Sequence, residues 1–596
     1  MRKKRFQHWS AAAIIALPLT SAPWRFADGH ESAGPAQLAA EGGTEVKQDF
    51  RAGAFAIDVS PTEFPVIVNG GMNERIGEKL LDPLHARCLV LDDGTERLAI
   101  VVVDSCMMPR VLLDEAKAMA QQETGIPANR MLICATHTHS APSVMACLGS
   151  RRDEVYTRFL PGQIAKGIKL ARDRLAPARI GWAMGRDEIN VASRRWLMKP
   201  GTVRANPFGA TGERAQMHPG YGNSGAIRPI GPVDPDVAVL SVQTRDGRPL
   251  ALVSNYSMHY VGGPSVSADY FAVFCDEIGK LIGAQRSPQP FVAMLANGTS
   301  GDTWCLDHGK PKRKFDRLSV AKDVAAAARK AYQTIRYYDW VPLVMDERLL
   351  KLDVRMPSID DLTQAKAMLE DAKARQDNKQ PTMPEVYAGE TVALSQLSPT
   401  RELKLQAIRI GELAITAMPN EVFSSTGLAI KQQSPLGMTF NISLANGADG
   451  YIPPPDQHEL GGYTTWRCRT SCLEIGAEPK IAKVVMALLQ NVASNRRQEK
   501  PILSANCKPD LTERHVRTRQ VPNRLKAQSG KDHLIMRSSL EEMQCSGRSL
   551  MPVNRKPAQA ARPTAKGTSI LRLQMKQHSW RARRNLRDIL WSIRKD

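Results

Sequence analysis

The sequence lacks internal repeats, and after residue 19 no stretch reaches 18 consecutive apolar residues. The absence of such a run argues against a membrane-spanning helix in the body of the chain. Ten cysteines in 596 residues are too few for a disulfide scaffold. Cys468 and Cys472 are four residues apart, and we expect either a disulfide or two buried thiols there. No second Cys/His pair lies close enough to complete a zinc half-site.

Most of the chain also has little net charge. The formal charge is +21, but residues 496–596 hold 24 Lys/Arg against 8 Asp/Glu, a net charge of +16. Only +5 therefore remains for the other residues. A nucleic-acid partner would depend on the basic tail alone, so we do not expect one for the body. The apolar content of 42% and charged content of 24% are ordinary for a globular protein.

The two ends of the chain differ in composition from its middle. Arg2 to Arg5 precede the short apolar run Ala11–Leu19 and then small residues, a pattern typical of an export signal. We assign residues 1–27 to a signal peptide and 28–50 to a linker, which predicts a periplasmic or secreted protein. Residues 496–596 have no sustained periodicity and are expected to form a basic, disordered tail. A basic amphipathic helix over 571–593 is the alternative.

Residues 51–495 are expected to form an α/β domain with a mixed sheet. Short apolar strands alternate with segments of helical spacing, which is typical of this class. We expect a helix over 111–122 with one apolar face, and an exposed helix over 359–374 capped by Ser358. The last helix is expected at 481–491. Residues 52–61 are expected to form a short strand with a turn. The other predicted strands cover 98–103, 131–135, 237–242, 250–255, 291–295, 406–410, 412–417 and the segment from 438.

Residues suited to chemistry follow several of these strands. In α/β folds, ligands bind in the crevice outside the carboxyl ends of strands. In a strand, the side chains of positions i and i+2 point to the same side. If the strand geometry continues past residue 135, His137 and His139 both face the cleft. We therefore expect a site at the strand ends. The residues concerned are His137, His139, His259, Asp302, Glu421 and Tyr451.

Two histidines, a carboxylate and a phenol form a reasonable donor set for zinc. Each residue alone has an ordinary structural explanation. A single histidine such as His259 is more often a buried or surface residue than a ligand. Glu421 could be the acidic residue of a helix N-terminus capped by Asn420, and Tyr451 could be a packing residue.

The order of these motifs resembles the neutral (alkaline, non-lysosomal) ceramidases. Residues 135–142, Ala-Thr-His-Thr-His-Ser-Ala-Pro, resemble the ATHTHSGP segment of that family. Five further segments follow in the same order over roughly 52–491. They are Asp82–Leu91, Asn255–His259 with Val266–Tyr270, Asn297–Asp302, Met418–Glu421, and Asn446–Tyr451 with Tyr463 downstream.

The resemblance implies one zinc ion per chain and a set of roles for the matched residues. Its zinc ligands would be His137, His259, Glu421 and Tyr451. Catalytic roles would fall to His139, Tyr463 and Asp302, and substrate binding to Gly301 of the glycine-rich loop and to Arg194 or Arg195. The substrate would be a lipid or another small molecule, which also implies peripheral association with a membrane.

Two departures from the family pattern affect the expected chemistry. The family loop continues from Gly-Asp into Ser-Pro-Asn, whereas here Asp302 is followed by Thr303, Trp304 and Cys305. A side-chain serine nucleophile is therefore missing at that place. The family's C-terminal β-sandwich also has no counterpart among residues 496–596. We expect a zinc-dependent hydrolase that cleaves an amide (N-acyl) bond with an activated water. The alternatives are a hydrolase of another N-acyl or ester substrate, such as a modified sugar, and a metal-binding member without turnover.

Overall fold

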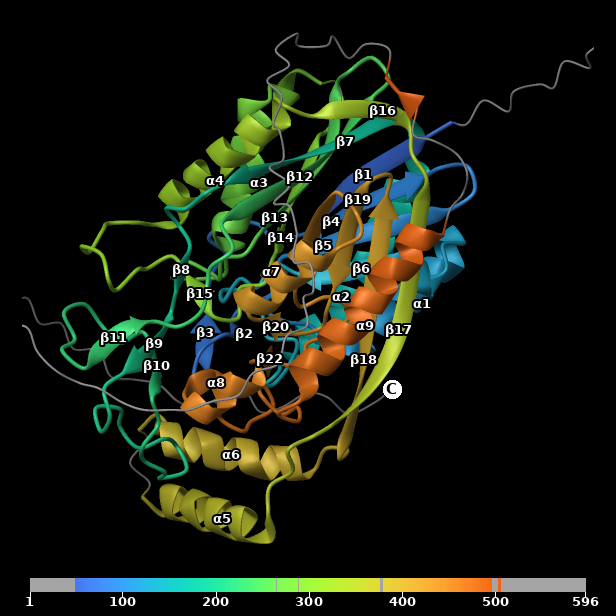
Figure 1. The fold of residues 1–596 in the computed structure, drawn as a ribbon. Coiled ribbons are helices and arrows are strands. Elements are labelled where there is room, and N and C mark those ends of the chain that lie inside the picture. The colour runs from blue at the N-terminus through green and yellow to red at the C-terminus, as the bar shows by residue number, and fades with distance from the viewer. Residues whose placement is uncertain (1–48, 264, 288, 376–378, 496–501, 505–596) are drawn as a thin grey trace, which may run out of the picture. The chain divides into compact units, whose positions relative to one another are not determined.

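The computed structural model describes residues 49–504, except 264, 288, 376–378 and 496–501 (Figure 1). These residues lie within one compact unit of the chain, 1–511. The predicted signal peptide 1–27, residues 28–48 of the predicted linker, and the predicted tail apart from residues 502–504 lie outside the described residues. Within the described part, no helix has the length and apolar character needed to cross a membrane.

The larger of two main sheets contains ten strands. Its principal order is β14-β13-β12-β7-β1-β4-β5-β6, with β16 beside β7 and β23 beside β16. β13 and β14 are parallel, as are β5 and β6, and the other pairs are antiparallel. The strands are β1 Arg51–Asp58, β4 His85–Asp92, β5 Arg97–Val103, β6 Met131–Ala135, β7 Ala176–Arg186, β12 Asp236–Thr244, β13 Pro249–Tyr256, β14 Val292–Asn297, β16 Arg336–Trp340 and β23 Ile502–Leu503.

The second main sheet has four strands in the order β17-β18-β19-β21. Smaller ladders pair β2 with β3, β8 with β15, β20 with β22, and β9 with both β10 and β11. The four strands are β17 Leu343–Asp353, β18 Thr400–Ile410, β19 Leu413–Ala417 and β21 Met438–Ile442. The strands of the smaller ladders are β2 Val66–Val68, β3 Arg75–Gly77, β8 Ala192–Ser193, β9 Arg195–Met198, β10 Ala215–Met217, β11 Ala226–Pro229, β15 Thr303–Trp304, β20 Glu421–Val422 and β22 Tyr451–Ile452.

The two main sheets pack face to face between layers of helices, as Figure 1 shows. Leu89 and Leu240 of the large sheet share one buried cluster with Ile415 and Phe440 of the smaller sheet. Helices α1 to α4 cover the other face of the large sheet, and α9 and α7 cover the outer face of the smaller one. The helices are α1 Arg110–Thr124, α2 Glu154–Asp173, α3 Asp269–Leu281, α4 Arg317–Tyr332, α5 Ile359–Ala374, α6 Met383–Ser395, α7 Ser424–Gln433, α8 Pro455–Leu460 and α9 Ala477–Ser494, with 3-10 turns η1 Ala128–Arg130, η2 Ala284–Arg286 and η3 Tyr463–Thr465.

The large sheet curls so that its edge strands β14 and β6 contact each other. The segment after β21 joins them, because Ser443 N donates to Asn297 O and Ala135 N donates to Leu444 O. The carboxyl ends of the two parallel pairs, β5–β6 and β13–β14, are thereby brought to one place. Segments far apart in the sequence meet there.

The expected mixed α/β class is confirmed. Each predicted strand is present, and the helices expected at 111–122, 359–374 and 481–491 appear as α1, α5 and α9. Ser358 caps α5 as expected, since its hydroxyl accepts from Asp361 N. Cys468 and Cys472 are buried thiols and form no disulfide, so the second of the two expected alternatives holds. The sequence did not predict the helices α2, α3, α4, α6, α7 and α8.

One local expectation is wrong. β6 ends at Ala135, and His137 has a left-handed φ of 73°. The alternation of side chains along a strand therefore does not place His137 and His139 together. A turn of the backbone does so instead, because residues beyond the strand follow the loop and not the pleat.

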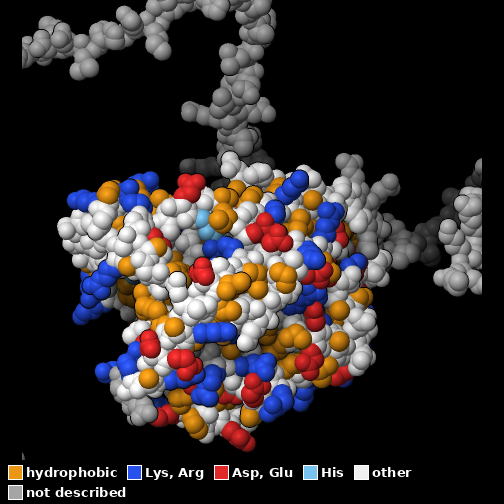
Figure 2. All heavy atoms as spheres, turned by 90° about the horizontal axis from the view of Figure 1, so that it is seen from below, with side chains coloured by type: hydrophobic (Ala, Val, Ile, Leu, Met, Phe, Trp, Pro, Cys, Tyr) orange, Lys and Arg blue, Asp and Glu red, His pale blue; other side chains and the backbone are white. Residues whose placement is uncertain are grey.

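The surface of the described residues shows how charges of the two signs are distributed. On the face shown in Figure 2, Lys and Arg side chains are interspersed with Asp and Glu and form no continuous basic field. A nucleic-acid surface is expected to present a basic patch or stripe. The face therefore offers no support for a nucleic-acid partner.

Candidate metal centre

Three histidines meet with the same ring nitrogen directed inward. In each ring, Nδ1 faces a backbone carbonyl, which can only accept a hydrogen bond. His137 donates to Cys106 O at 2.8 Å, His139 to Gly70 O at 2.7 Å and His259 to Ser300 O at 3.2 Å. A ring that carries one proton in this position therefore holds it on Nδ1, and its Nε2 presents a lone pair.

These lone pairs converge on one another and on a carboxylate. The Nε2 atom of His137 is 3.0 Å from that of His259 and 3.2 Å from that of His139. Glu421 Oε2 lies 3.3 Å from His137 Nε2 and 3.8 Å from His259 Nε2. This oxygen is buried and has no hydrogen-bond partner. Acceptors that face each other without a donor repel, so a cation between them, either a metal ion or a proton, would stabilise the arrangement.

The separations suit a tetrahedral metal ion. Bonds of about 2.0–2.1 Å hold neighbouring ligand atoms roughly 3.3 Å apart in a tetrahedron. The observed spacings of 3.0, 3.3 and 3.8 Å between the ligand atoms of His137, His259 and Glu421 lie around that value. The carbonyls that hold the Nδ1 atoms supply the outer hydrogen bonds that histidine ligands normally have. The donor set therefore fits zinc.

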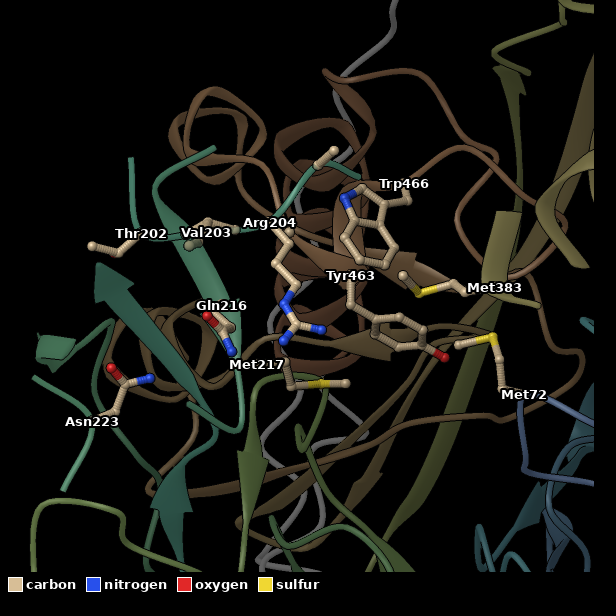
Figure 3. Close-up of a pocket in the computed structure, with 13 residues that line it drawn as sticks. Met72, Thr202, Val203, Arg204, Gln216, Met217, Asn223, Met383, Tyr463 and Trp466 are labelled. Atoms are coloured by element: carbon tan, nitrogen blue, oxygen red, sulfur yellow. The ribbon is translucent and has the colours of Figure 1, made fainter. Parts of the chain in front are cut away.

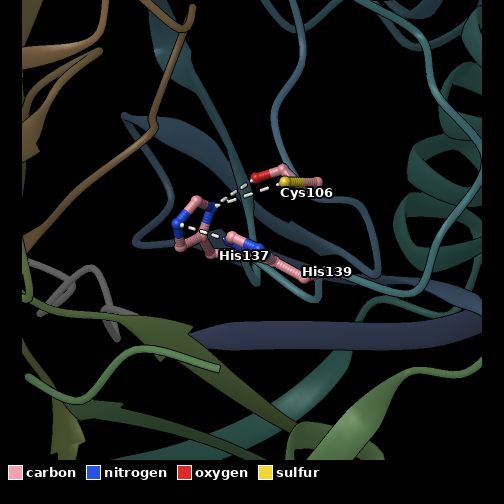
Figure 4. A group of neighbouring side chains, drawn as sticks. All are labelled: Cys106, His137 and His139. Carbon is pink, nitrogen blue, oxygen red and sulfur yellow. Dashed lines mark hydrogen bonds between the residues drawn. The ribbon is translucent and has the colours of Figure 1, made fainter. Parts of the chain in front are cut away.

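A second group of ligand atoms, Cys106, His137 and His139, lies within metal-binding range and is drawn in Figure 4. Its thiol is on the Nδ1 side of His137, at 3.9 Å. That nitrogen already donates to the Cys106 carbonyl. Burial also raises the pKa of Cys106 well above its usual range and keeps the thiol protonated. The group with His259 and Glu421 is therefore the better metal site.

Glu421 and Tyr451 are positioned by backbone pairing. They are direct partners in the parallel ladder of β20 and β22. The glycine-rich loop packs tightly behind this ladder, since Gly301 N donates to Val422 O. A Cβ atom on Gly301 would lie 2.6 Å from Glu421 O, so only glycine allows this approach.

His139 is held by two further residues. Its ring stacks on Tyr260, with centroids 3.6 Å apart, and Gly70 has a φ of 99°. A Cβ on Gly70 would come within 2.4 Å of the His139 ring. Burial, together with the nearby His137, lowers the pKa of His139 well below its usual value. The ring is therefore neutral at physiological pH and can accept a proton at Nε2.

Arg194 is buried beside the proposed ligands. Its Nη2 donates to Tyr451 Oη and to Gly301 O, both at 2.9 Å, and its Nε has no partner. Burial opposes its charge, but Tyr451 and Glu421 nevertheless raise its pKa above the ordinary value. Arg194 thus supplies a positive charge next to Tyr451, and its role in substrate binding stays a prediction.

Tyr463 connects this centre to the exterior. Its ring centroid is 5.8 Å from that of Tyr451. On its other side the ring lines a cavity of about 580 Å³, bounded by β10, Trp466 and the start of α6 (Figure 3). Its hydroxyl makes no hydrogen bond with any described residue.

Arg195 and Asp302 have different surroundings from the other candidates. Arg195 binds Gln457 O at 2.8 Å and Gly461 O at 2.6 Å, and so anchors the loop that carries Tyr463. Asp302 accepts a hydrogen bond from Ser424 N, at the start of α7, and burial raises its pKa to about 6. Within the described part of the chain, neither side chain forms a hydrogen bond or ion pair with the histidine cluster. Both have the environment of positioning residues.

The hydroxyls of the glycine-rich loop are occupied by other partners. Ser300 Oγ donates to Asn297 Oδ1 at 3.0 Å, and Thr303 Oγ1 donates to Ser257 O at 2.7 Å. An imidazole does lie near one of them, because His259 Nδ1 is 3.5 Å from Ser300 Oγ. That nitrogen is already directed at the Ser300 carbonyl. It is therefore poorly placed to accept the hydroxyl proton.

Several supporting residues were not predicted from sequence. They are Gly70, Cys106 and Tyr260, together with Arg75, which donates to the carbonyl of His139. Only Tyr260 had a local signal, since it directly follows His259 in the motif. The others act through backbone atoms or lie far away in sequence, so spacing does not reveal them.

Comparison with known proteins agrees with this picture at the level of the fold. No family model matches the chain. The crystal structure of neutral ceramidase from Pseudomonas aeruginosa matches with a TM-score of 0.55 and 16% identity, over 78% of this chain and 77% of that one. A ceramidase complexed with C2 matches with a TM-score of 0.56 and 15% identity, over 78% of each chain. The resemblance expected from the motifs is therefore confirmed as a shared fold.

Proposed function

We propose that this protein is a zinc-dependent hydrolase of an amide (N-acyl) bond, of the ceramidase type. One observation carries the proposal. Three imidazoles, each with Nδ1 held by a backbone carbonyl, direct Nε2 into the same space as a Glu421 oxygen that has no hydrogen-bond partner. His137, His259, Glu421 and Tyr451 would hold one zinc ion. Bound zinc would polarise a carbonyl and lower the pKa of a water.

The chain's own residues supply the remaining functions. His139, neutral and fixed by Gly70 and Tyr260, accepts a proton at Nε2 and returns it to the leaving amine. The free hydroxyl of Tyr463 donates to the substrate carbonyl oxygen as negative charge develops there. Arg194 holds Tyr451 and places a buried positive charge beside it. Arg195 and Asp302 hold the surrounding loops in place through their hydrogen bonds.

Two alternatives are kept. The same arrangement would suit hydrolysis of an ester or of another N-acyl compound, such as an acylated sugar. A chain that binds zinc without turnover is the non-enzymatic alternative. A lipid substrate with peripheral membrane association remains part of the proposal, supported by the fold of the ceramidases matched above. The export signal remains a proposal from the sequence.

The experiment is metal quantification on the purified full chain, followed by a screen of N-acyl and ester compounds. About one zinc per chain and turnover of N-acyl amides is the expected result. Turnover of esters alone would favour the first alternative. Bound zinc with no turnover of any compound would favour the second.

A further inference from the structure

The cavity in front of Tyr463 contains a positive charge that no described residue neutralises. Arg204 is exposed in the segment that precedes β10, and in Figure 3 its guanidinium extends toward the Tyr463 ring beside Gln216 and Met217. No carboxylate is among the residues that line this cavity. Arg204 makes no hydrogen bond or ion pair with any residue that the structure describes.

Glu213, a carboxylate behind the walls of this cavity, already accepts hydrogen bonds from other residues. Glu213 accepts hydrogen bonds from Asn206 Nδ2 at 2.9 Å, from Gly462 N at 2.8 Å and from Trp466 Nε1 at 2.9 Å. These bonds tie the Arg204 segment to the loop that carries Tyr463. Glu213 therefore fixes the shape of the cavity and leaves Arg204 without an acidic partner.

The other polar groups of the lining separate into two kinds. Thr202 and Asn223 are satisfied locally, by donation to Lys199 O and Pro219 O. The side-chain amide of Gln216 and the hydroxyl of Tyr463, like Arg204, make no hydrogen bonds with described residues. Three groups that line this one cavity therefore have no hydrogen-bond partner among the described residues: a guanidinium, an amide and a phenol hydroxyl.

The rest of the lining is largely apolar and adaptable. Met72, Met217 and Met383 contribute thioether side chains around the Tyr463 ring (Figure 3). Methionine accommodates hydrocarbon of varied shape because its side chain is unbranched and flexible. The cavity therefore combines a surface for a hydrocarbon chain with an unneutralised guanidinium, a combination that suits an amphipathic anion.

We propose, building on the hydrolase function above, that the substrate is an N-acyl amide whose amine part carries an anionic group, a carboxylate or a phosphate. Arg204 and Gln216 bind the anion, and the methionines contact the hydrocarbon chain. Tyr463 lies between this cavity and the metal centre, next to the amide. Arg204 is a specificity residue and takes no part in bond cleavage.

Binding and turnover are measured separately on the full chain. The probes share one acyl chain: N-octanoylglycine with a carboxylate, O-phospho-N-octanoylethanolamine with a phosphate, and neutral N-octanoylethanolamine. Quenching of tryptophan fluorescence on rapid mixing reports binding, because Trp466 lines the cavity. The test variant is Arg204→Gln. Lys199→Gln is the matched control, since it removes an exposed cation of the same segment that does not line the cavity.

We expect at least one anionic probe to bind about tenfold more tightly than the neutral one. Arg204→Gln should remove that preference, with affinity for the neutral probe unchanged, and Lys199→Gln should retain it. The preferred anion identifies the group. Equal affinity for all probes, no binding of any probe, or a preference that persists in Arg204→Gln would overturn the proposal. Absence of turnover despite selective binding would count against the hydrolase function alone.

Discussion

Glu421 lies directly opposite Tyr451 in the parallel ladder of β20 and β22. The backbone itself thereby places a phenol beside the carboxylate that contacts the histidine cluster. Arg194 reinforces this arrangement from the side by donating to the Tyr451 hydroxyl. The candidate metal centre thus depends on strand pairing as well as on its histidines.

The first prediction concerns metal content. His137→Ala and His259→Ala should each reduce bound zinc from about one per chain to a small fraction of that, because each removes an Nε2 ligand. Elemental analysis after dialysis measures this. His308→Ala is the control, since its ring packs against His218 and Tyr221 and not against the cluster. Full zinc retention in both ligand variants would rule out the assigned site.

The second prediction concerns Tyr463. Tyr463→Phe should lower kcat by about 10²–10³-fold, because it removes a donor to the developing oxyanion, while KM and zinc content change little. Steady-state kinetics with an N-acyl amide measure this. Tyr387→Phe is the matched control, because its buried hydroxyl also has no partner but does not line the cavity. Equal kinetics of the two variants would remove Tyr463 from the mechanism.

The third prediction concerns the attacking group. Ser300→Ala and Thr303→Ala should retain most of the turnover, because both hydroxyls donate elsewhere and a side-chain nucleophile needs a base that takes its proton. Glu421→Ala should abolish turnover. Intact-mass analysis during turnover is the second measurement. A trapped acyl group on Ser300 or Thr303 would contradict attack by water.

Local periodicity was enough to predict the strands β1, β5, β6, β12, β13, β14, β18, β19 and β21, but not the long strands β7 and β17. The order of the motifs came from the family resemblance. Periodicity was also enough to place His137 and His259 after separate strands. The curl that brings β14 against β6 depends on long-range packing, and no local pattern encodes it. For the same reason the sequence could not separate Arg194 from its neighbour Arg195. The first reaches the metal centre and the second anchors a loop, a difference that arises only from tertiary contacts.

The fourth prediction concerns export and follows from the sequence alone. Protein from the native host should begin after Ala22 or Ala27, because small residues precede both positions. N-terminal sequencing measures this directly. Finding Met1 on the mature protein would reject the signal peptide.

The last prediction concerns Lys117, a fully buried lysine on α1. Its ammonium donates to Asn446 Oδ1 at 2.6 Å, in a region that Lys404 and Arg110 make more positive and Glu347 and Asp114 make more negative. Burial is the main cause that lowers its pKa from 10.5 to about 7. Between these pH values the unfolded chain binds more protons than the folded chain. The free energy of unfolding therefore rises with pH across this window, by up to about 1.4 kcal/mol per pH unit.

Replacing this lysine with methionine should remove that contribution. Between pH 7.5 and 9.5, the free energy of unfolding of the native chain should rise relative to that of Lys117→Met by about 2 kcal/mol. Denaturant unfolding at both pH values, with zinc in equal excess, measures the difference, and other titrating groups cancel between the two proteins. Lys166→Met, at an exposed position on α2, should leave the slope of the native chain unchanged. Parallel pH profiles for the native chain and Lys117→Met would show that the buried lysine has no lowered pKa, because only a group that titrates differently in the two states can tilt the stability curve.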